Sequence, residues 1–171
     1  MIKDSSKLLI ICAHPDDEVL GCGGLIAKYS STIPVKILML AEGSTCRFKD
    51  INSKEALKAI EERHFYFEES CKVLGVTNFE THRLRCGCLS NLPILDINRI
   101  IETCITEYNP THIFTHYNFD NNNDHRVVSR ATDMATRPKV GSSIEALFQY
   151  EIQSSTDWNF SNSQFQPNYF L

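Results

Sequence analysis

The chain has 171 residues, of which 42% are hydrophobic and 22% are charged, and its formal net charge at pH 7 is -4. These values are typical of one globular domain, residues 1–171, with a substantial apolar core. The sequence contains no basic stripe, which argues against nucleic acid as a partner. The apolar run from Leu8 to Ala13 is too short for a membrane span and short for the core of a signal peptide. We therefore expect a cytoplasmic protein.

The first half of the chain predicts a strand, a helix, a second strand and a long helix. Continuous apolar runs at Lys7–Ala13 and Pro34–Leu40 suit strands that are buried on both faces of a sheet. Between them, Glu18–Ser31 has the pattern of a helix that begins within a glycine-rich stretch. After a polar loop, Asn52 and Glu55 resemble a capping box, which would begin the long helix.

The second half continues the same alternation. Its predicted elements are strands at Phe79–Leu84, Thr111–His116 and Ala146–Ile152, and helices at Pro93–Tyr108 and Asp124–Thr136. Strands that alternate with helices indicate an α/β fold, with a Rossmann-like, doubly wound and mostly parallel sheet and helices on both faces. Ligands of such sheets bind beyond the carboxyl ends of the strands, so residues that follow strands are the candidates for a functional site.

The seven cysteines have irregular spacing, and no Cys-x-x-Cys motif is present. Cys86 and Cys88 are the closest pair along the chain, and Cys-x-Cys alone is a weak metal signal. We expect free thiols in a reducing compartment.

A concentration of ionisable side chains directly follows the first predicted strand, in the run from His14 through Asp16 and Asp17 to Glu18. An imidazole and a carboxylate three residues apart, on a turn from strand to helix, can converge on one point, and both suit zinc. A catalytic zinc ion takes three protein ligands, so a third should follow another strand. The alternative interpretation is an Asx turn that caps the next helix.

A second polar run begins at His116, at the end of a later strand, and ends at Asp124 and His125 where a helix begins. His125 is a plausible third ligand, with Asp124 as a carboxylate that supports a ligand. The alternative is a solvated loop, a common role of Asn-rich stretches. Both runs lie at carboxyl ends of predicted strands, which favours a joint metal site. The glycines after Glu18 do not match a dinucleotide-binding pattern, and close packing explains them better.

These residues resemble a known family. The stretch Ala13–Glu18 with the glycines behind it is similar to the signature of PIG-L/LmbE-like zinc-dependent N-deacetylases, which act on N-acetylglucosamine-type sugars. Asp124 and His125 resemble the second motif of that family. The segment Leu38–Gly43 followed by Arg47 resembles its second strand and substrate loop, and Tyr150–Trp158 resembles a branch associated with cell-surface polysaccharide.

The resemblance implies a role for each matching residue. His14, Asp17 and His125 would hold zinc, or iron(II), which the same ligands suit. Asp16 would be the general base that takes a proton from water, and Asp124 would support a metal ligand. Arg47 would contact the substrate. The implied reaction hydrolyses an N-acetyl group from a nucleotide-, lipid- or polysaccharide-linked sugar and releases acetate.

Two departures from the family pattern accompany the resemblance. Asn122 stands where well-known members have a histidine that is assigned as general acid or oxyanion stabiliser, so His116, Asp124 or Asp16 would have to protonate the leaving amine. Family members also continue beyond the point where this chain ends. We therefore expect a C-terminally truncated family fold whose exposed sheet face another copy of the chain could cover. The alternatives are a catalytically impaired sugar- or nucleotide-binding relative and a hydrolase of a different amide.

Overall fold

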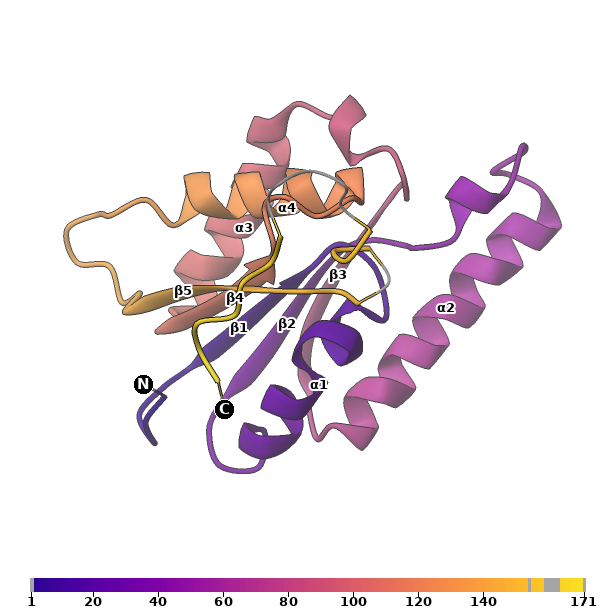
Figure 1. Cartoon of the computed structure of the whole chain (residues 1–171). Helices are drawn as coiled ribbons and strands as arrows, with labels where there is room; N and C mark the ends of the chain where they lie inside the picture. The colour runs from indigo at the N-terminus through magenta and orange to yellow at the C-terminus, as the bar shows by residue number, and fades with distance from the viewer. Residues whose placement is uncertain (1, 154, 159–163, 171) are drawn as a thin grey trace.

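The computed structural model describes residues 2–153, 155–158 and 164–170, and they form one parallel sheet with helices on both faces (Figure 1). The strands are β1 (Leu8–Cys12), β2 (Val35–Ala41), β3 (Asn78–Leu84), β4 (His112–His116) and β5 (Ala146–Tyr150). The helices are α1 (Asp17–Tyr29), α2 (Lys54–Val73), α3 (Ile94–Tyr108) and α4 (Asn123–Ala135), with short 3-10 helices η1 (Thr45–Arg47) and η2 (Leu89–Asn91). The predicted fold class is confirmed.

The strand order is β3-β2-β1-β4-β5, and every neighbouring pair is parallel. Strand β1 is buried along its whole length, which explains why its sequence is apolar without alternation. Leu8 and Ile10 pack against α1 and α2, whereas Leu9 and Ile11 pack against α3 and α4. Figure 1 shows these helix pairs on opposite sides of the sheet. The two faces of β1 therefore carry two separate cores.

The predicted element boundaries agree with the structure to within about two residues, which is the usual uncertainty of helix and strand ends. One cap was assigned wrongly. Ser53 begins α2, and its hydroxyl accepts a hydrogen bond from the backbone N–H of Ala56, so Asn52 is not the capping residue. Asn122 caps α4, because its side chain accepts from the N–H of Asp124 at 2.9 Å.

The chain order reverses between β1 and β4. From β1 the chain builds outward to β2 and β3, and it then returns to add β4 and β5 on the other side of β1. The loops that leave β1 and β4 diverge at this point, which is where open α/β sheets bind ligands. Both polar runs of the sequence follow these two strands.

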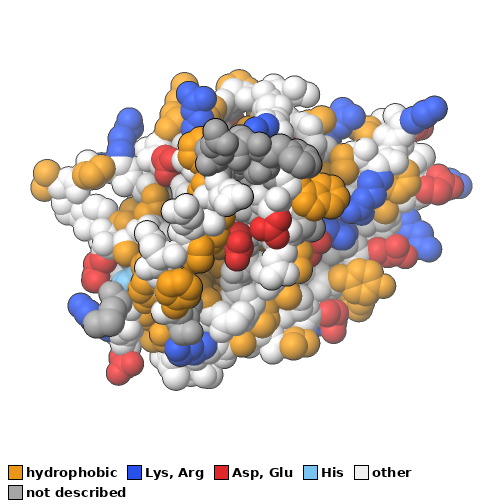
Figure 2. Space-filling view, in the orientation of Figure 1, with side chains coloured by type: hydrophobic (Ala, Val, Ile, Leu, Met, Phe, Trp, Pro, Cys, Tyr) orange, Lys and Arg blue, Asp and Glu red, His pale blue; other side chains and the backbone are white. Residues whose placement is uncertain are grey.

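Aromatic side chains cover the sheet beside β5. A groove of about 770 Å³ there is lined by Phe148 and Tyr150 of β5 and by residues 164–170 of the C-terminal segment, and hydrophobic side chains gather over this region in the lower left of Figure 2. The ring of Tyr150 also lies against Gly21 of α1, where a Cβ would approach it to 2.3 Å. The expected close packing is thus confirmed for Gly21. Within the described residues, no helix is long and apolar enough to cross a membrane.

Candidate metal centre

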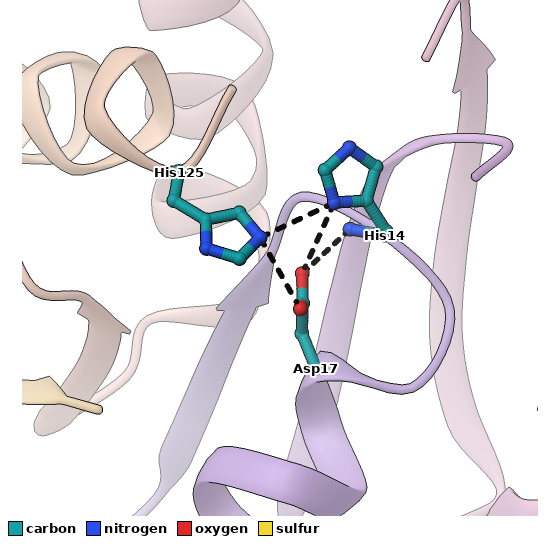
Figure 3. Close-up of side chains that lie close together, drawn as sticks. All are labelled: His14, Asp17 and His125. Atoms are coloured by element: carbon teal, nitrogen blue, oxygen red, sulfur yellow. Dashed lines mark hydrogen bonds and ion pairs between the residues drawn. The ribbon is translucent and has the colours of Figure 1, made fainter. Parts of the chain in front are cut away.

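Three side chains from the two sequence motifs converge at the carboxyl ends of β1 and β4 (Figure 3). His14 lies in the turn after β1, Asp17 begins α1, and His125 lies in the first turn of α4. His14 Nδ1 is 3.3 Å from His125 Nε2 and 3.7 Å from Asp17 Oδ2, and His125 Nε2 is 3.4 Å from Asp17 Oδ1. All three residues are buried. The structure thus brings together the three ligands that the sequence predicts.

The spacing of these atoms fits a metal ion. Ligand atoms about 2.0–2.1 Å from a tetrahedral zinc ion are about 3.3–3.4 Å from one another, close to the separations between His14, Asp17 and His125. The second ring nitrogen of each histidine faces a carboxylate, Asp124 for His14 and Asp120 for His125. Such carboxylates fix the orientation and tautomer of metal-binding imidazoles. The donor set therefore fits zinc or iron(II).

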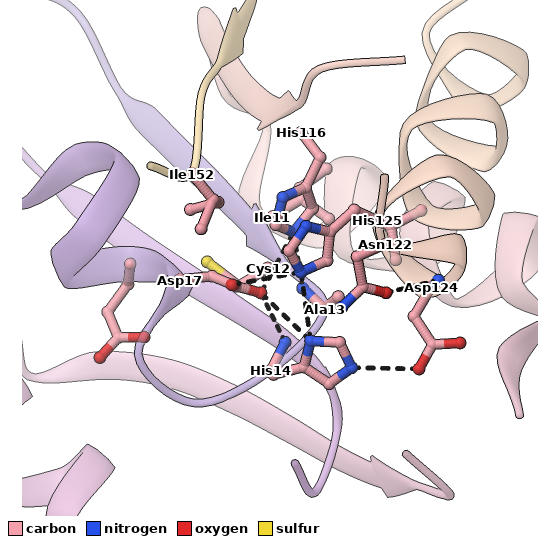
Figure 4. A network of polar contacts seen from close by, with 12 residues as sticks. Ile11, Cys12, Ala13, His14, Asp17, His116, Asn122, Asp124, His125 and Ile152 are labelled. Atoms are coloured by element: carbon pink, nitrogen blue, oxygen red, sulfur yellow. Dashed lines mark hydrogen bonds and ion pairs between the residues drawn. The ribbon is translucent and has the colours of Figure 1, made fainter. Parts of the chain in front are cut away.

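Asp124 links His14 to the loop before η2. Its Oδ2 lies 3.0 Å from His14 Nε2 and accepts from the N–H of Gly87 at 2.6 Å, while Oδ1 accepts from the N–H of Leu89 at 3.1 Å (Figure 4). Burial raises the pKa of Asp124, but its bonds to His14 and to these N–H groups outweigh burial and lower it. An ionised carboxylate with every oxygen occupied suits a supporting role and is a poor proton donor.

Asp120 holds His125 in the same way, although it is not among the site residues that the sequence predicts. Its Oδ1 is 3.3 Å from His125 Nδ1, and its Oδ2 accepts from the hydroxyls of Ser155 and Thr156. Burial lowers the pKa of His125, but its bonds to Asp120 and Asp17 outweigh burial and raise the pKa to about 9. The signal for Asp120 in the sequence was its place in the polar run between His116 and His125, and the structure buries it completely.

His116, one of the candidates for the general acid, is enclosed by its neighbours. Its side chain has no exposed surface, its ring stacks on His125 with centroids 3.9 Å apart, and its Nε2 accepts from the N–H of Ala13. Nε2 also lies 3.2 Å from Asp17 Oδ2. Burial lowers the pKa of His116 to about 4. A neutral ring that is enclosed in this way is poorly placed to donate a proton to a bound substrate.

Asp16 is the polar residue of the first motif that faces outward. Its carboxyl group is about half exposed, and Oδ2 accepts from Arg63 of α2 at 2.6 Å. Burial, and then the charge of Asp17, raise the pKa of Asp16, while Arg63 opposes them. The backbone has a φ of 114°, a strained conformation for a residue with a Cβ, and Glu18 stabilises it by accepting from the N–H of Asp16.

Arg47 lies on η1, in the loop that leaves β2, and its side chain is exposed. The same loop reaches the first motif at Gly43, whose position close to Pro15 and His14 leaves little room for a Cβ. The predicted substrate contact is thus on a segment that adjoins the site.

Comparison with known proteins assigns the family. Residues 9–136 match the PIG-L family, described as GlcNAc-PI de-N-acetylase. The chain belongs to the PIG-L family. The match includes both motifs and all three converging side chains, so the family expectation from the sequence is confirmed.

Relatives of known name are similar over part of their length. A probable N-acetyl-alpha-D-glucosaminyl L-malate deacetylase 2 from Bacillus anthracis is 26% identical over 120 residues, which cover 68% of this chain and 52% of the relative. The chain thus spans about half of that relative.

Solved structures show the same fold. The conserved protein TT1542 from Thermus thermophilus has a TM-score of 0.69 and 24% identity, covering 95% of this chain and 69% of that protein. N,N'-diacetylchitobiose deacetylase from Pyrococcus horikoshii has a TM-score of 0.65 and 24% identity, and the match covers 76% of this chain and 49% of that protein.

Proposed function

We propose that this chain is a metal-dependent hydrolase that removes the N-acetyl group from an N-acetylglucosamine-type sugar and releases acetate. The observation that carries the proposal is the buried cluster of His14, Asp17 and His125 in a member of the PIG-L family. Two relatives are named as deacetylases of N-acetylated sugars, which supports this substrate class. The sugar would be carried on a nucleotide, a lipid or a polysaccharide.

His14, Asp17 and His125 would hold the metal ion, zinc or iron(II). When bound, such an ion supplies Lewis-acid activation of water and of an amide carbonyl. Asp124 and Asp120 keep the two imidazoles in the tautomers that leave His14 Nδ1 and His125 Nε2 free to bind.

Asp16 carries the proton transfers in this proposal. It is adjacent to a ligand, about half exposed and ionisable, so it can take a proton from the attacking water. The same carboxyl group would then give that proton to the leaving amine. Asp124 is ionised and fully bonded and His116 is enclosed, which leaves Asp16 as the candidate for both steps. Arg63 fixes its orientation through the 2.6 Å ion pair.

Arg47 would contact the substrate. It is exposed on the loop beside the first motif, and a guanidinium group suits hydroxyl, carboxylate or phosphate oxygens of a sugar and its carrier.

An assay of acetate release tests the proposal. The zinc-loaded protein is incubated with UDP-N-acetylglucosamine and with simple N-acetylglucosaminides, and acetate is measured. We expect release by the wild-type chain and a loss of about 10²–10⁴-fold in Asp16→Asn, with zinc content unchanged. Zinc and sugar binding without acetate from any N-acetyl sugar would favour the impaired, sugar-binding relative instead.

A further inference from the structure

Two cysteines that are distant in sequence lie in contact beside the candidate metal centre. The Sγ atoms of Cys46 and Cys86 are 3.2 Å apart, with Cys86 as donor and Cys46 as acceptor of the S–H hydrogen bond. Cys46 is exposed on η1, whereas Cys86 is buried in the loop after β3. The nearest cysteine in sequence to Cys86 is Cys88, yet the structure brings Cys86 to Cys46.

A buried carboxylate holds the two cysteine segments together. Glu42, at the end of β2, accepts from the backbone N–H groups of Ser44 and Thr45 on one side and of Cys86 on the other, the last at 2.8 Å. Gly87 also approaches the same loop, since a Cβ there would lie 3.2 Å from the Cβ of Cys46. The backbone contacts therefore hold the two cysteine segments side by side.

The pair is connected to a candidate ligand through one short path. Gly87, directly after Cys86, donates its N–H to Asp124, which lies 3.0 Å from His14 Nε2. Cys86 also offers its sulfur within 4.8 Å of the ligand atoms of His14 and Asp124. Two hydrogen bonds, from Gly87 to Asp124 and between Asp124 and His14, therefore connect the segment of Cys86 to the candidate ligand His14.

We propose that Cys46 and Cys86 are an oxidation site, a dithiol that closes to a reversible disulfide and thereby changes the metal centre. With hydrogen peroxide as the two-electron oxidant, the Cys46 thiolate attacks one peroxide oxygen, giving a sulfenic acid and hydroxide. The sulfur of Cys86 then attacks the sulfenic sulfur, the S–O bond breaks, and the proton of Cys86 leaves in water. Two thiols and one peroxide yield one disulfide and two water molecules.

The exposures of the two residues set the order of the steps. Cys46 is exposed, so a small oxidant can reach it, and its sulfur already contacts that of Cys86. Cys86 is buried and faces the Cys46 sulfur, the position that a resolving thiol needs. Closure brings the sulfurs from 3.2 Å to about 2.05 Å, and the proposal requires the backbone at Gly87 to share in this movement.

Mass spectrometry of the full chain after peroxide treatment tests the pairing. Free thiols are blocked with N-ethylmaleimide, and the protein is digested with trypsin without reduction. We expect a cross-link between the peptides 37–47 and 86–99 that a reductant reverses. Trypsin leaves Cys86 and Cys88 in one peptide, so Cys88→Ser is the matched control and should keep the cross-link. Cys46→Ser and Cys86→Ala should abolish it.

Two results would overturn the pairing: a cross-link that persists in Cys86→Ala, and full alkylation of Cys46 after peroxide. The zinc affinity of the oxidised and reduced proteins then tests the coupling, and it needs no acetate assay. We expect at least a tenfold difference, the usual effect of disturbing a residue that orients a metal ligand, and no effect of peroxide on the affinity of Cys46→Ser. A disulfide that leaves zinc affinity unchanged would contradict the coupling to His14.

Discussion

The state of His125 makes a quantitative prediction about metal binding. His125 Nδ1 lies 3.3 Å from Asp120 and Nε2 lies 3.4 Å from Asp17, and these carboxylates raise its pKa to about 9 despite burial. A metal ion binds only the neutral imidazole, so at lower pH it must displace a proton. The neutral fraction of His125 falls from about one half at pH 9 to about one hundredth at pH 7, which weakens binding about 50-fold, or about 2.3 kcal/mol.

The variant Asp120→Asn isolates this effect. It keeps the size of the side chain but removes a charge that raises the pKa of His125, so protons should compete less with the metal at pH 7. It also weakens the orientation of the ring, which should lower zinc affinity about 10- to 100-fold where proton competition is absent. The zinc affinity of Asp120→Asn should therefore fall furthest below that of the wild type near pH 9, and the difference should be smaller at pH 7.

The assay is zinc titration against a competing chelator at pH 7, 8 and 9, for the wild type and for Asp120→Asn. Asp96→Asn is a control, because Asp96 pairs with Arg99 on the exposed surface of α3. Proton release by other groups is common to all three proteins and cancels in the comparison. Equal pH slopes for the wild type and Asp120→Asn would refute the assigned role of Asp120.

Three further outcomes follow from the contacts described above. Arg63→Met should raise the pKa of Asp16, because a positive partner is removed. The acid limb of the pH profile of kcat/KM should therefore move to higher pH, whereas the control Lys58→Met on the same helix should leave it in place. Asp16→Ala should keep one bound metal per chain, measured by elemental analysis, because Asp16 is outside the converging cluster; loss of the metal would contradict its assignment. Gly21→Ala should lower stability by about 1–3 kcal/mol in thermal unfolding, because the new methyl group meets an aromatic ring at 2.3 Å, whereas Gly24→Ala, in open space, should be neutral or stabilising.

The fold and the converging cluster were predictable because their signals are local. Buried parallel strands read as continuous apolar runs, and the ends of such strands are where ligands bind. His14 and Asp17 lie three residues apart on one turn, and His125 follows a polar run after a second strand. The motif spacing and the sheet rules were enough to bring these three side chains together.

The partners of the cluster were not predictable in the same way. Arg63 reaches Asp16 from the middle of α2, and Cys46 meets Cys86 across two loops, so neither contact leaves a spacing signal in the sequence. The position of His116 after β4 indicated its proximity to the site but not its enclosure beneath His125. Burial of a particular side chain depends on the packing of several elements together.

Anomalous diffraction at the zinc absorption edge, from crystals of the full chain grown with zinc, tests the central claim most directly. We predict one peak bounded by His14 Nδ1, His125 Nε2 and the carboxylate of Asp17. The second possible group of ligands, formed by His14, Cys86 and Asp124, should be without a peak. A peak at that second group, or no peak at either, would contradict the proposed metal centre.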